Sequence, residues 1–302
     1  MSRRSVMKKE KNPFQISNPD KLLFPDMGIT KLEYIKSLYE LAPYLLNYTG
    51  NRNLTAIHYP DGVGEKSYYQ KNIPSHAPDF IKRHELDGTE YIVMDKVETL
   101  LWMGNMAALE FHIPFNTLDR PDYPDALVFD LDPSEGQPFQ QVIEAALTIY
   151  ETLKELGIQC FCKTSGATGM QVAISTGQEL HYETAREINH FFGQYFVEKY
   201  PHIFTIERKV KARGKKLYFD YLQMWQGKTI IAPYSPRANI TANVSAPVLW
   251  EELEKGVKPE DFTLRTIHAR LKDKGDIFKQ LCTSPLEPGL KAVMDKLNLY
   301  QS

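Results

Sequence analysis

The sequence predicts a mixed α/β fold with largely antiparallel sheets. Seven segments with strand character interleave with three amphipathic helices, without the strict alternation of a parallel doubly wound sheet. Two of these strands are joined only by SGATG, whose glycines allow a tight reversal of the chain. With 302 residues and 42% hydrophobic content, the chain is long enough for one large domain or two modest ones with a sizeable core.

Each predicted helix carries a boundary signal. The first begins at Thr30, which stands at capping-box spacing from Glu33 and precedes apolar residues at helical intervals. The second spans residues 139–156 and is followed by Gly157, a residue type that suits a helix C-terminus. The third spans residues 183–200 and is closed by Pro201.

The predicted strands are short runs rich in β-branched and aromatic residues. Side chains alternate between the two faces of a strand, so the stretch DALVFDLDP places Leu127, Phe129 and Leu131 on one face. Asp130 and Asp132 share the other face, where two like charges are costly unless a cation or a proton compensates them. The seven candidates are residues 53–60, 90–95, 126–132, 158–164, 170–175, 216–223 and 228–235.

The chain shows one candidate boundary and one candidate arm. Residues 119–125 divide an N-terminal module, 16–120, from a second module, 121–300. Residues 1–15 are basic and lack the apolar segment of a secretory signal, so we interpret them as a flexible arm. No apolar run approaches the about 20 residues that span a bilayer, and the three cysteines make neither a disulfide framework nor a zinc quartet. We expect a reduced, cytoplasmic protein without membrane contact.

Charge is distributed unevenly along the chain. The net charge of −2 does not predict a polyanion partner for the surface as a whole. Residues 207–216, ERKVKARGKK, nevertheless hold six lysines and arginines and lead directly into the strand candidate that contains Asp220. Such a run is usually a solvated edge, but beside a strand carboxylate it favours contact with nucleic acid.

Asp130, Asp132 and Asp220 suit a site for hard divalent cations. Mg²⁺ and Mn²⁺ prefer oxygen ligands and are commonly completed by substrate phosphates. Two such ions about 3.5–4 Å apart can activate a hydroxyl and neutralise a leaving pyrophosphate. The alternative is a simple strand end at which Asp132 caps a turn before Pro133. The nearby basic run and the third aspartate favour the metal site.

Two further segments could bind phosphate. The SGATG turn lacks the Lys-Ser/Thr of a nucleotide P-loop, but its backbone N–H groups and Ser165 could hold a phosphate. Lys228 begins the last strand candidate, and Ser235 and Arg237 follow it, where an arginine can pair bidentately with phosphate oxygens. An ordinary hairpin turn and solvated surface charges are the alternatives.

Seven motifs then follow one another across nearly the whole chain, and together they resemble one family. They are NPDKLLFPDMGITK, HYPDGVGEKSYYQK, LEFHIP, LVFDLDP, KTSGATG, RGKKLYFDYLQ and TIIAPYSPRA. In this order they resemble the polymerase domain of bacterial ligase D, of the archaeo-eukaryotic primase superfamily, which works in non-homologous end joining. The resemblance implies a single primase–polymerase domain over residues 16–300, with an RRM-like catalytic sheet and an α/β N-terminal module.

The resemblance also implies an activity. It is the template-directed addition of nucleotides at DNA ends and gaps that carry a 5′-phosphate. Two Mn²⁺ or Mg²⁺ ions would be the cofactors, NTPs or dNTPs the substrates, and ribonucleotides the preferred ones. The expected partners are a Ku-like protein and an ATP-dependent DNA ligase, and the expected location is the nucleoid.

Matching positions carry the family's site residues into this chain. The metal ligands become Asp130, Asp132 and Asp220, and the active-site histidine near the triphosphate becomes His112, which would otherwise be interpreted as a core histidine. The triphosphate contacts match Ser165, Gln171, Lys228, Ser235 and Arg237. The 5′-phosphate lysines match Lys21 and Lys31, otherwise surface charges, and the template aromatics match Tyr68 and Tyr69, one of which core packing would also explain.

The chain departs from the family's pattern at three positions. Thr168 and Gln171 replace the lysine and histidine of KTSG-x-K-G-L-H-V, and Met224 stands where an asparagine is usual. Gln171 can donate through its amide but carries no positive charge, and the lost charge-assisted bonds would cost about 1–3 kcal/mol. We expect a working enzyme with altered nucleotide affinity.

Other functions stay open. A DNA-end-binding synapsis scaffold with weakened catalysis would fit Thr168 and Gln171, and a primase that starts chains unprimed or a two-metal phosphodiesterase would use the same aspartates. The sequence has no K-x-D-G motif of a nucleotidyl-lysine ligase. We therefore expect a stand-alone polymerase or a domain whose ligase is encoded elsewhere.

Overall fold

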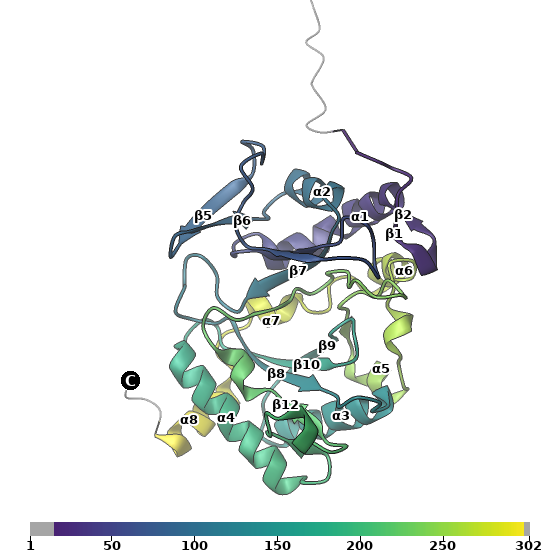
Figure 1. The fold of residues 1–302 in the computed structure, drawn as a ribbon. Helices are drawn as coiled ribbons and strands as arrows, with labels where there is room; N and C mark the ends of the chain where they lie inside the picture. Colours follow the sequence, from purple (N-terminus) through teal and green to yellow (C-terminus); the bar gives the residue numbers. More distant parts are fainter. Residues whose placement is uncertain (1–14, 299–302) are drawn as a thin grey trace, which may run out of the picture.

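Two mainly antiparallel β-sheets face each other and carry most of the core. The computed structural model describes residues 15–298, so the predicted arm, 1–15, lies almost entirely outside the described residues. The two sheets belong to an upper and a lower half in Figure 1, and side chains from both line a small internal cavity of about 50 Å³ between them. The mixed α/β fold with largely antiparallel sheets is confirmed.

The larger sheet has six strands, with the aspartate-bearing strand near its middle. All of its pairings are antiparallel except the one between the two strands at one edge. The strands lie in the order β11 (Phe204–Thr205), β12 (Leu217–Phe219), β8 (Ala126–Asp132), β10 (Met170–Ser175), β9 (Phe161–Thr164) and β14 (Pro247–Val248). The SGATG turn joins β9 to β10, as predicted.

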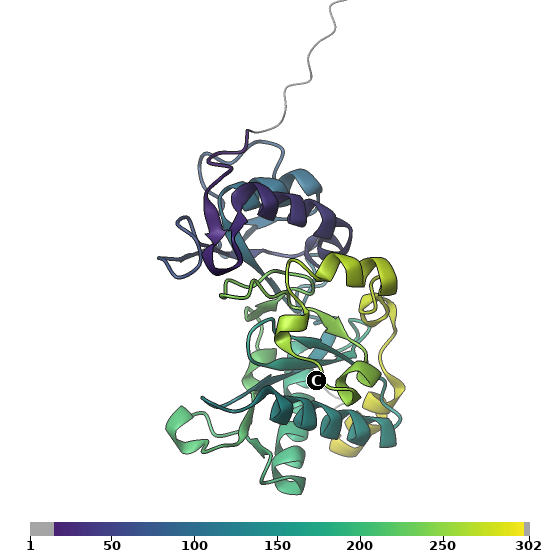
Figure 2. The same ribbon diagram turned by 90° about the vertical axis from the view of Figure 1, so that its right-hand side faces the viewer.

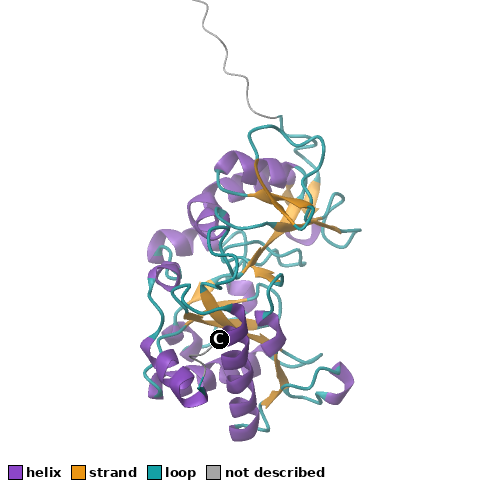
Figure 3. Cartoon of the chain, turned by 90° about the vertical axis from the view of Figure 1, so that its left-hand side faces the viewer, coloured by secondary structure: helices purple, strands orange, loops and turns teal. Residues whose placement is uncertain are grey.

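Two helices cover one face of this sheet, as the strand alternation requires. They are α3 (Phe139–Glu155) and α4 (Tyr182–Lys199), within one residue of their predicted bounds. Phe129 of β8 packs on α4, with ring centroids 5.2 Å from Phe192 and 6.3 Å from Phe196. The apolar face of β8 is thereby buried, and Asp130 and Asp132 lie on the opposite face of the strand. Figure 3 shows the helices of the lower half in purple beside its strands in orange.

The smaller sheet combines segments from both sides of residue 120. Its order is β13 (Thr229–Ile231), β7 (Ala108–Pro114), β3 (Thr55–His58) and β4 (Tyr68–Gln70). β7 was not among the predicted strands, although its sequence alternates apolar residues with Glu110 and His112, the pattern that indicates a strand. β13 comes after Asp220, the last predicted metal ligand, in the sequence, yet it pairs with β7 of the N-terminal half. The division into modules stays a prediction, and the sheet crosses it.

Helices α1 (Lys31–Thr49) and α2 (Val97–Asn105) pack beside the smaller sheet (Figure 1). The predicted capping box is confirmed: the Glu33 N–H donates to Thr30 Oγ1 at 3.3 Å, and the Thr30 N–H donates to Glu33 Oε2 at 2.8 Å. The Tyr34 hydroxyl of α1 donates to the Ala108 carbonyl at 2.6 Å, which holds the helix against the start of β7.

A buried arginine joins the two halves. Arg52 donates to the carbonyls of Pro114 and Asn116, both at 3.0 Å, and pairs with Asp125, the residue just before β8. The remaining elements are two hairpins and four C-terminal helices that run beside both halves in Figure 2. They are β1 (Leu22–Phe24), β2 (Ile29–Thr30), β5 (Lys82–Leu86), β6 (Thr89–Val93), α5 (Trp250–Glu254), α6 (Ile267–Lys274), α7 (Lys279–Thr283) and α8 (Pro288–Leu297). Within residues 15–298, no helix has both the length and the apolar character to cross a bilayer.

Candidate active site

Three carboxylates converge at the end of β8. The antiparallel register pairs Tyr218 with Asp132, and the Asp220 N–H donates to the Asp130 carbonyl at 3.0 Å, so Asp220 stands opposite Asp130. Directly opposite residues on neighbouring strands share a face. One carboxylate oxygen from each of the three aspartates lies within 4.8 Å of the others. The structure thus brings the three predicted metal ligands together.

Burial and the neighbouring carboxylates raise the pKa of two of these aspartates. Burial, then the charge of Asp132, raises the pKa of Asp130 to about 7, although a hydrogen bond from Gln171 opposes the rise. Burial and the charge of Asp220 also raise the pKa of Asp132. A divalent cation would relieve this repulsion, and three carboxylates are the oxygen donors that Mg²⁺ and Mn²⁺ prefer. The donor set therefore fits the predicted cofactor.

Hydrogen bonds from neighbouring groups hold two of the three carboxylates in place. Gln171 lies opposite Asp130 on β10, and its Nε2 donates to Asp130 Oδ1 at 3.0 Å. Its own Oε1 is buried and accepts no hydrogen bond within residues 15–298. Asp220 Oδ1 accepts from the Tyr218 hydroxyl at 3.2 Å and from the Leu222 N–H at 3.1 Å. Gln171 therefore orients a ligand, a role that the sequence did not indicate.

The structure also shows where Met224 and the basic run, residues 207–216, lie. Met224 is fully buried and its Sδ accepts from the Val128 N–H at 3.4 Å, so it packs beside β8. In the basic run, the Arg213 guanidinium lies 3.7 Å from the centroid of the Tyr218 ring. Part of that run is thereby held next to Asp220.

An open cleft of about 270 Å³ lies beside the carboxylates. Residues from both sheets form its walls, so cationic and anionic groups face the same space. Six of the predicted site residues line it: His112, Asp130, Asp132, Ser165, Gln171 and Arg237. Thr168, in the position of the family's lysine, lines it as well.

The SGATG turn forms one rim of the cleft. Ser165 Oγ accepts from the N–H groups of Ala167 and Gly169, both at 3.1 Å, so the serine shapes the turn and occupies two of the N–H groups considered for phosphate. Gly166 has a φ of +72°, and a Cβ built there would lie 2.5 Å from Cγ of Arg237. The Arg237 stem therefore passes close to a position that favours glycine.

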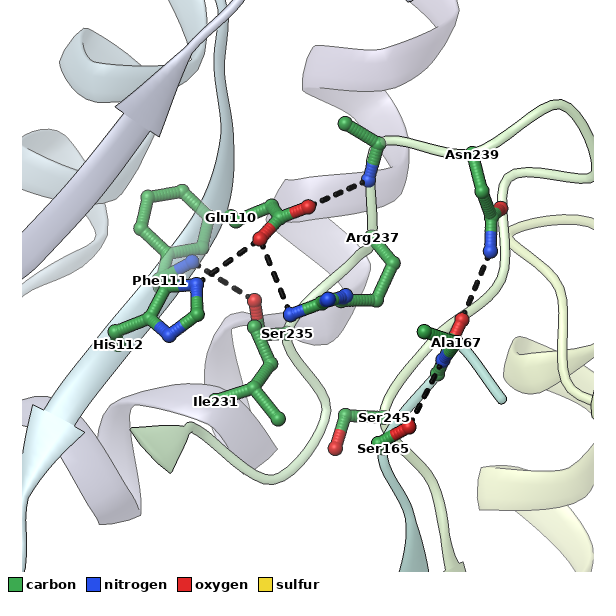
Figure 4. A network of polar contacts seen from close by, with 12 residues as sticks. Glu110, Phe111, His112, Ser165, Ala167, Ile231, Ser235, Arg237, Asn239 and Ser245 are labelled. Atoms are coloured by element: carbon green, nitrogen blue, oxygen red, sulfur yellow. Dashed lines mark hydrogen bonds and ion pairs between the residues drawn. The ribbon is translucent and has the colours of Figure 1, made fainter. Parts of the chain in front are cut away.

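Glu110, which the sequence interpretation missed, contacts two of the predicted site residues, His112 and Arg237. Glu110 Oε2 lies 3.0 Å from Nε2 of His112 and 3.2 Å from Nη1 of Arg237 (Figure 4). Glu110 Oε1 accepts from the Ala238 N–H at 3.1 Å. Burial raises the pKa of Glu110, but the His112 hydrogen bond and the Arg237 charge outweigh burial and set it below its ordinary value. The two-residue spacing to His112 within one strand was the signal that could have identified Glu110.

Two predicted triphosphate contacts do not lie in the cleft. Ser235 is fully buried, and its Oγ accepts from the Phe111 N–H at 2.9 Å and donates to the Pro236 carbonyl at 3.0 Å. Its hydroxyl therefore ties the loop after β13 to β7, because both of its hydrogen-bonding functions are used there. Lys228 is exposed at the start of β13 and is not among the residues that line the cleft.

The predicted 5′-phosphate lysines lie together at the start of α1. The Lys31 N–H donates to the Lys21 carbonyl at 2.8 Å. Lys21 Nζ lies 2.6 Å from Asp61, whereas Lys31 is buried and its Nζ donates to the Asn105 carbonyl at 3.0 Å. Burial, and then the charge of Lys21, lowers the pKa of Lys31. Lys21 is thus the more accessible of the two cations.

The predicted template aromatics lie on the edge strand β4. Tyr68 is 47% exposed and stacks on the buried His58, with ring centroids 4.8 Å apart. Tyr69 is 74% exposed. Successive residues of a strand point to opposite faces, so the two rings cannot form one stacked pair. Core packing partly explains Tyr68, while Tyr69 is free to meet a base.

Comparison with known proteins agrees with this geometry. Residues 30–278 match the family described as LigD, primase-polymerase domain. The chain is 38% identical over 284 residues to the bifunctional non-homologous end joining protein LigD of Bacillus subtilis, covering 94% of this chain and 46% of that protein. It is 29% identical over 296 residues to the multifunctional LigD of Mycolicibacterium smegmatis, covering 95% of this chain and 38% of that protein. The chain thus spans less than half the length of these curated relatives.

A solved structure is also similar. The polymerase domain of Mycobacterium tuberculosis ligase D, in complex with DNA, superimposes with a TM-score of 0.82 at 27% sequence identity. The match covers 90% of this chain and 99% of that one.

Proposed function

The chain belongs to the LigD primase-polymerase domain family of DNA-directed nucleotidyltransferases, and from this premise we propose that it fills gaps and extends 3′ ends at DNA breaks in non-homologous end joining. The observation that carries the proposal is the convergence of Asp130, Asp132 and Asp220 beside a cleft whose opposite wall holds His112 and Arg237. Acidic groups thus stand where cations would be held, and basic groups stand where phosphates would lie. That combination is the requirement of nucleotidyl transfer.

Asp130, Asp132 and Asp220 would hold two divalent ions, Mn²⁺ or Mg²⁺, which lower the pKa of an attacking hydroxyl and neutralise pyrophosphate charge when bound. The protein's own contribution is positioning. Gln171 orients Asp130, while Tyr218 and the Leu222 N–H orient Asp220, so the carboxylates need little rearrangement. Arg237 and His112 would receive the triphosphate, with Ser165 at the rim of the cleft and Lys228 reaching it from outside.

Contacts with DNA would lie at the start of α1 and on the edge strand β4. Lys21, with Lys31 behind it, would hold the 5′-phosphate across the gap, and Tyr69 would stack on a template base, with Tyr68 beside it. Base–aromatic stacking is worth about 1–3 kcal/mol per base and tolerates any sequence. We include in the proposal a preference for ribonucleotides, a cytoplasmic, nucleoid-associated location, and action with a Ku-like protein and an ATP-dependent DNA ligase.

Primer extension on a gapped, 5′-phosphorylated duplex with Mn²⁺ and ribonucleotides tests the proposal. The wild type should add template-directed nucleotides, and Asp130→Ala should abolish addition while the affinity for the gapped duplex is retained. Asp295→Ala is the matched control, because Asp295 is exposed on α8. Extension by Asp130→Ala contradicts the metal assignment, and DNA binding without addition by the wild type favours an end-binding scaffold.

A further inference from the structure

Glu110 is the one acidic side chain in the described residues that contacts both side chains proposed to receive the triphosphate, His112 and Arg237. Alternation along β7 puts Glu110 and His112 on the same face of the strand. The third partner, Arg237, comes from the loop after β13, and a single oxygen, Oε2, meets both cationic side chains at 3.0 and 3.2 Å (Figure 4). The Glu110 side chain is only 6% exposed, compared with 16% for His112 and 25% for Arg237.

The sequence builds this contact from several directions. Ser235 ties the loop to β7 through the Phe111 N–H, and the Ala232 N–H donates to the Phe111 carbonyl at 2.9 Å. Further along the same loop, the Ala238 N–H donates to Glu110 Oε1. Gly166 leaves the space through which the Arg237 stem runs. These constraints hold the Glu110 carboxylate against His112 and Arg237, so that the orientation of neither side chain depends on rotamer preference alone.

An anionic group beside a triphosphate site needs an explanation, because its charge opposes that of the substrate. Glu110 uses one nitrogen of each partner. A guanidinium has five N–H donors, and the imidazole has a second nitrogen, Nδ1, that makes no hydrogen bond within residues 15–298. Arg237 therefore keeps free N–H donors for a ligand after Glu110 has fixed its orientation, and among the described residues His112 keeps one ring nitrogen free. Charged side chains held in this way lose less conformational entropy when a ligand binds.

We propose that Glu110 is a positioning residue for nucleotide binding, which holds His112 and Arg237 as one unit facing the phosphates. This inference rests on the proposed function. It gives Glu110 no contact with the substrate and no proton to transfer. Its effect should therefore appear in nucleotide affinity, and it should depend on the presence of Arg237.

Glu110→Gln tests the inference, because the variant keeps an oxygen for the Ala238 N–H but turns an NH₂ group towards two other donors. We expect the KM for the incoming nucleotide to rise about tenfold, equivalent to about 1.4 kcal/mol. The value of kcat at saturating nucleotide and the affinity for gapped DNA should stay near those of the wild type. Glu144→Gln, on the exposed face of α3, is the matched control and should change neither parameter.

A double-mutant cycle separates positioning from a merely structural role. In an Arg237→Gln background, Glu110→Gln should raise KM by much less than tenfold, since its main partner is gone. An unchanged KM in Glu110→Gln, or the same tenfold effect in both backgrounds, overturns the inference. Calorimetric titration with a nucleoside triphosphate and Mn²⁺ gives a readout that does not need turnover. If the wild type binds nucleotide but fails to extend, the proposed polymerase fails, while weaker titration by Glu110→Gln still supports the positioning role.

Discussion

Gly166→Ala should weaken nucleotide binding far more than a glycine-to-alanine change of equal backbone strain elsewhere. Gly166 has a φ of +72°, and the added Cβ would lie 2.5 Å from Cγ of Arg237 and 3.0 Å from the Ser245 backbone nitrogen. The backbone neighbour cannot move easily, so the Arg237 side chain has to swing away. Its contact with Glu110 at 3.2 Å would then be broken.

The control is Gly157, which has a φ of +68° and no atom within 4 Å of the built Cβ. Placing an L-residue in the left-handed region costs about 1–2 kcal/mol, so both variants should lose stability by that amount. Only Gly166→Ala also displaces Arg237. A hydrogen bond to a charged group is worth about 1.5–3 kcal/mol, so nucleotide affinity should fall about 10- to 150-fold.

Two measurements separate these contributions. Thermal unfolding should show a Tm decrease for both variants, of about 2–4 °C per kcal/mol or slightly less at this chain length, and the decrease should be at least as large for Gly166→Ala, which also loses the Arg237–Glu110 contact. Calorimetric titration with a nucleoside triphosphate should show weaker binding for Gly166→Ala alone. If both variants bind nucleotide like the wild type, then Arg237 either stays in place or contributes nothing to binding, and the reasoning about this loop is wrong.

Three further changes test other parts of the structure. Lys21→Ala should remove most of the preference for a phosphorylated gap and lower the salt dependence of DNA binding by about one phosphate contact. Lys36 is exposed on α1, and Lys36→Ala should change neither property. An equal preference for the phosphorylated gap in Lys21→Ala and the wild type contradicts the role of Lys21. Arg52→Met leaves Asp125 uncompensated in a mostly buried site, so urea unfolding should show a loss of about 3–5 kcal/mol, and a loss below about 1 kcal/mol would contradict it. Burial raises the pKa of Glu110, but its hydrogen-bonded and cationic neighbours set the net value below 4.5, so its charge stabilises the fold above pH 4.5 and this stabilisation is lost as pH falls further. The unfolding free energy of Glu110→Gln should therefore depend less on pH below about 4.5 than that of the wild type, as urea titrations across that range would show.

Local signals predicted much of the fold. The alternation around Phe129 located β8 and its faces, and the Thr30–Glu33 pair located the start of α1, because each depends only on residues close in sequence. β7 was not predicted, although Glu110 and His112 alternate with apolar residues there, because this short segment was interpreted only as a motif. The pairing of β13 with β7 joins residues more than 100 positions apart, and no local pattern reports such a partner.

The candidate site was likewise predicted where local motifs report it and missed where it depends on contacts between distant residues. Motif order brought the three aspartates, His112 and Arg237 into one prediction. In the structure Asp130, Asp132, His112 and Arg237 line one cleft, and Asp220 lies next to the other two aspartates. Motifs do not report which way a side chain points, so Ser235 was interpreted as a phosphate contact although its hydroxyl binds backbone. Glu110 was missed because its importance lies in contacts with residues 2 and 127 positions away, and only the nearer one is visible in a strand pattern.

The placement of β13 has a consequence for how the chain could be divided. A cut in the loop at residue 120 would leave the first fragment with β7 lacking one hydrogen-bonding neighbour, and the second with a short strand that has nothing to pair with. Unpaired strand edges favour association. The two fragments, produced separately, should therefore reassemble by pairing of β13 with β7. Nucleotide addition by the mixture would report that reassembly.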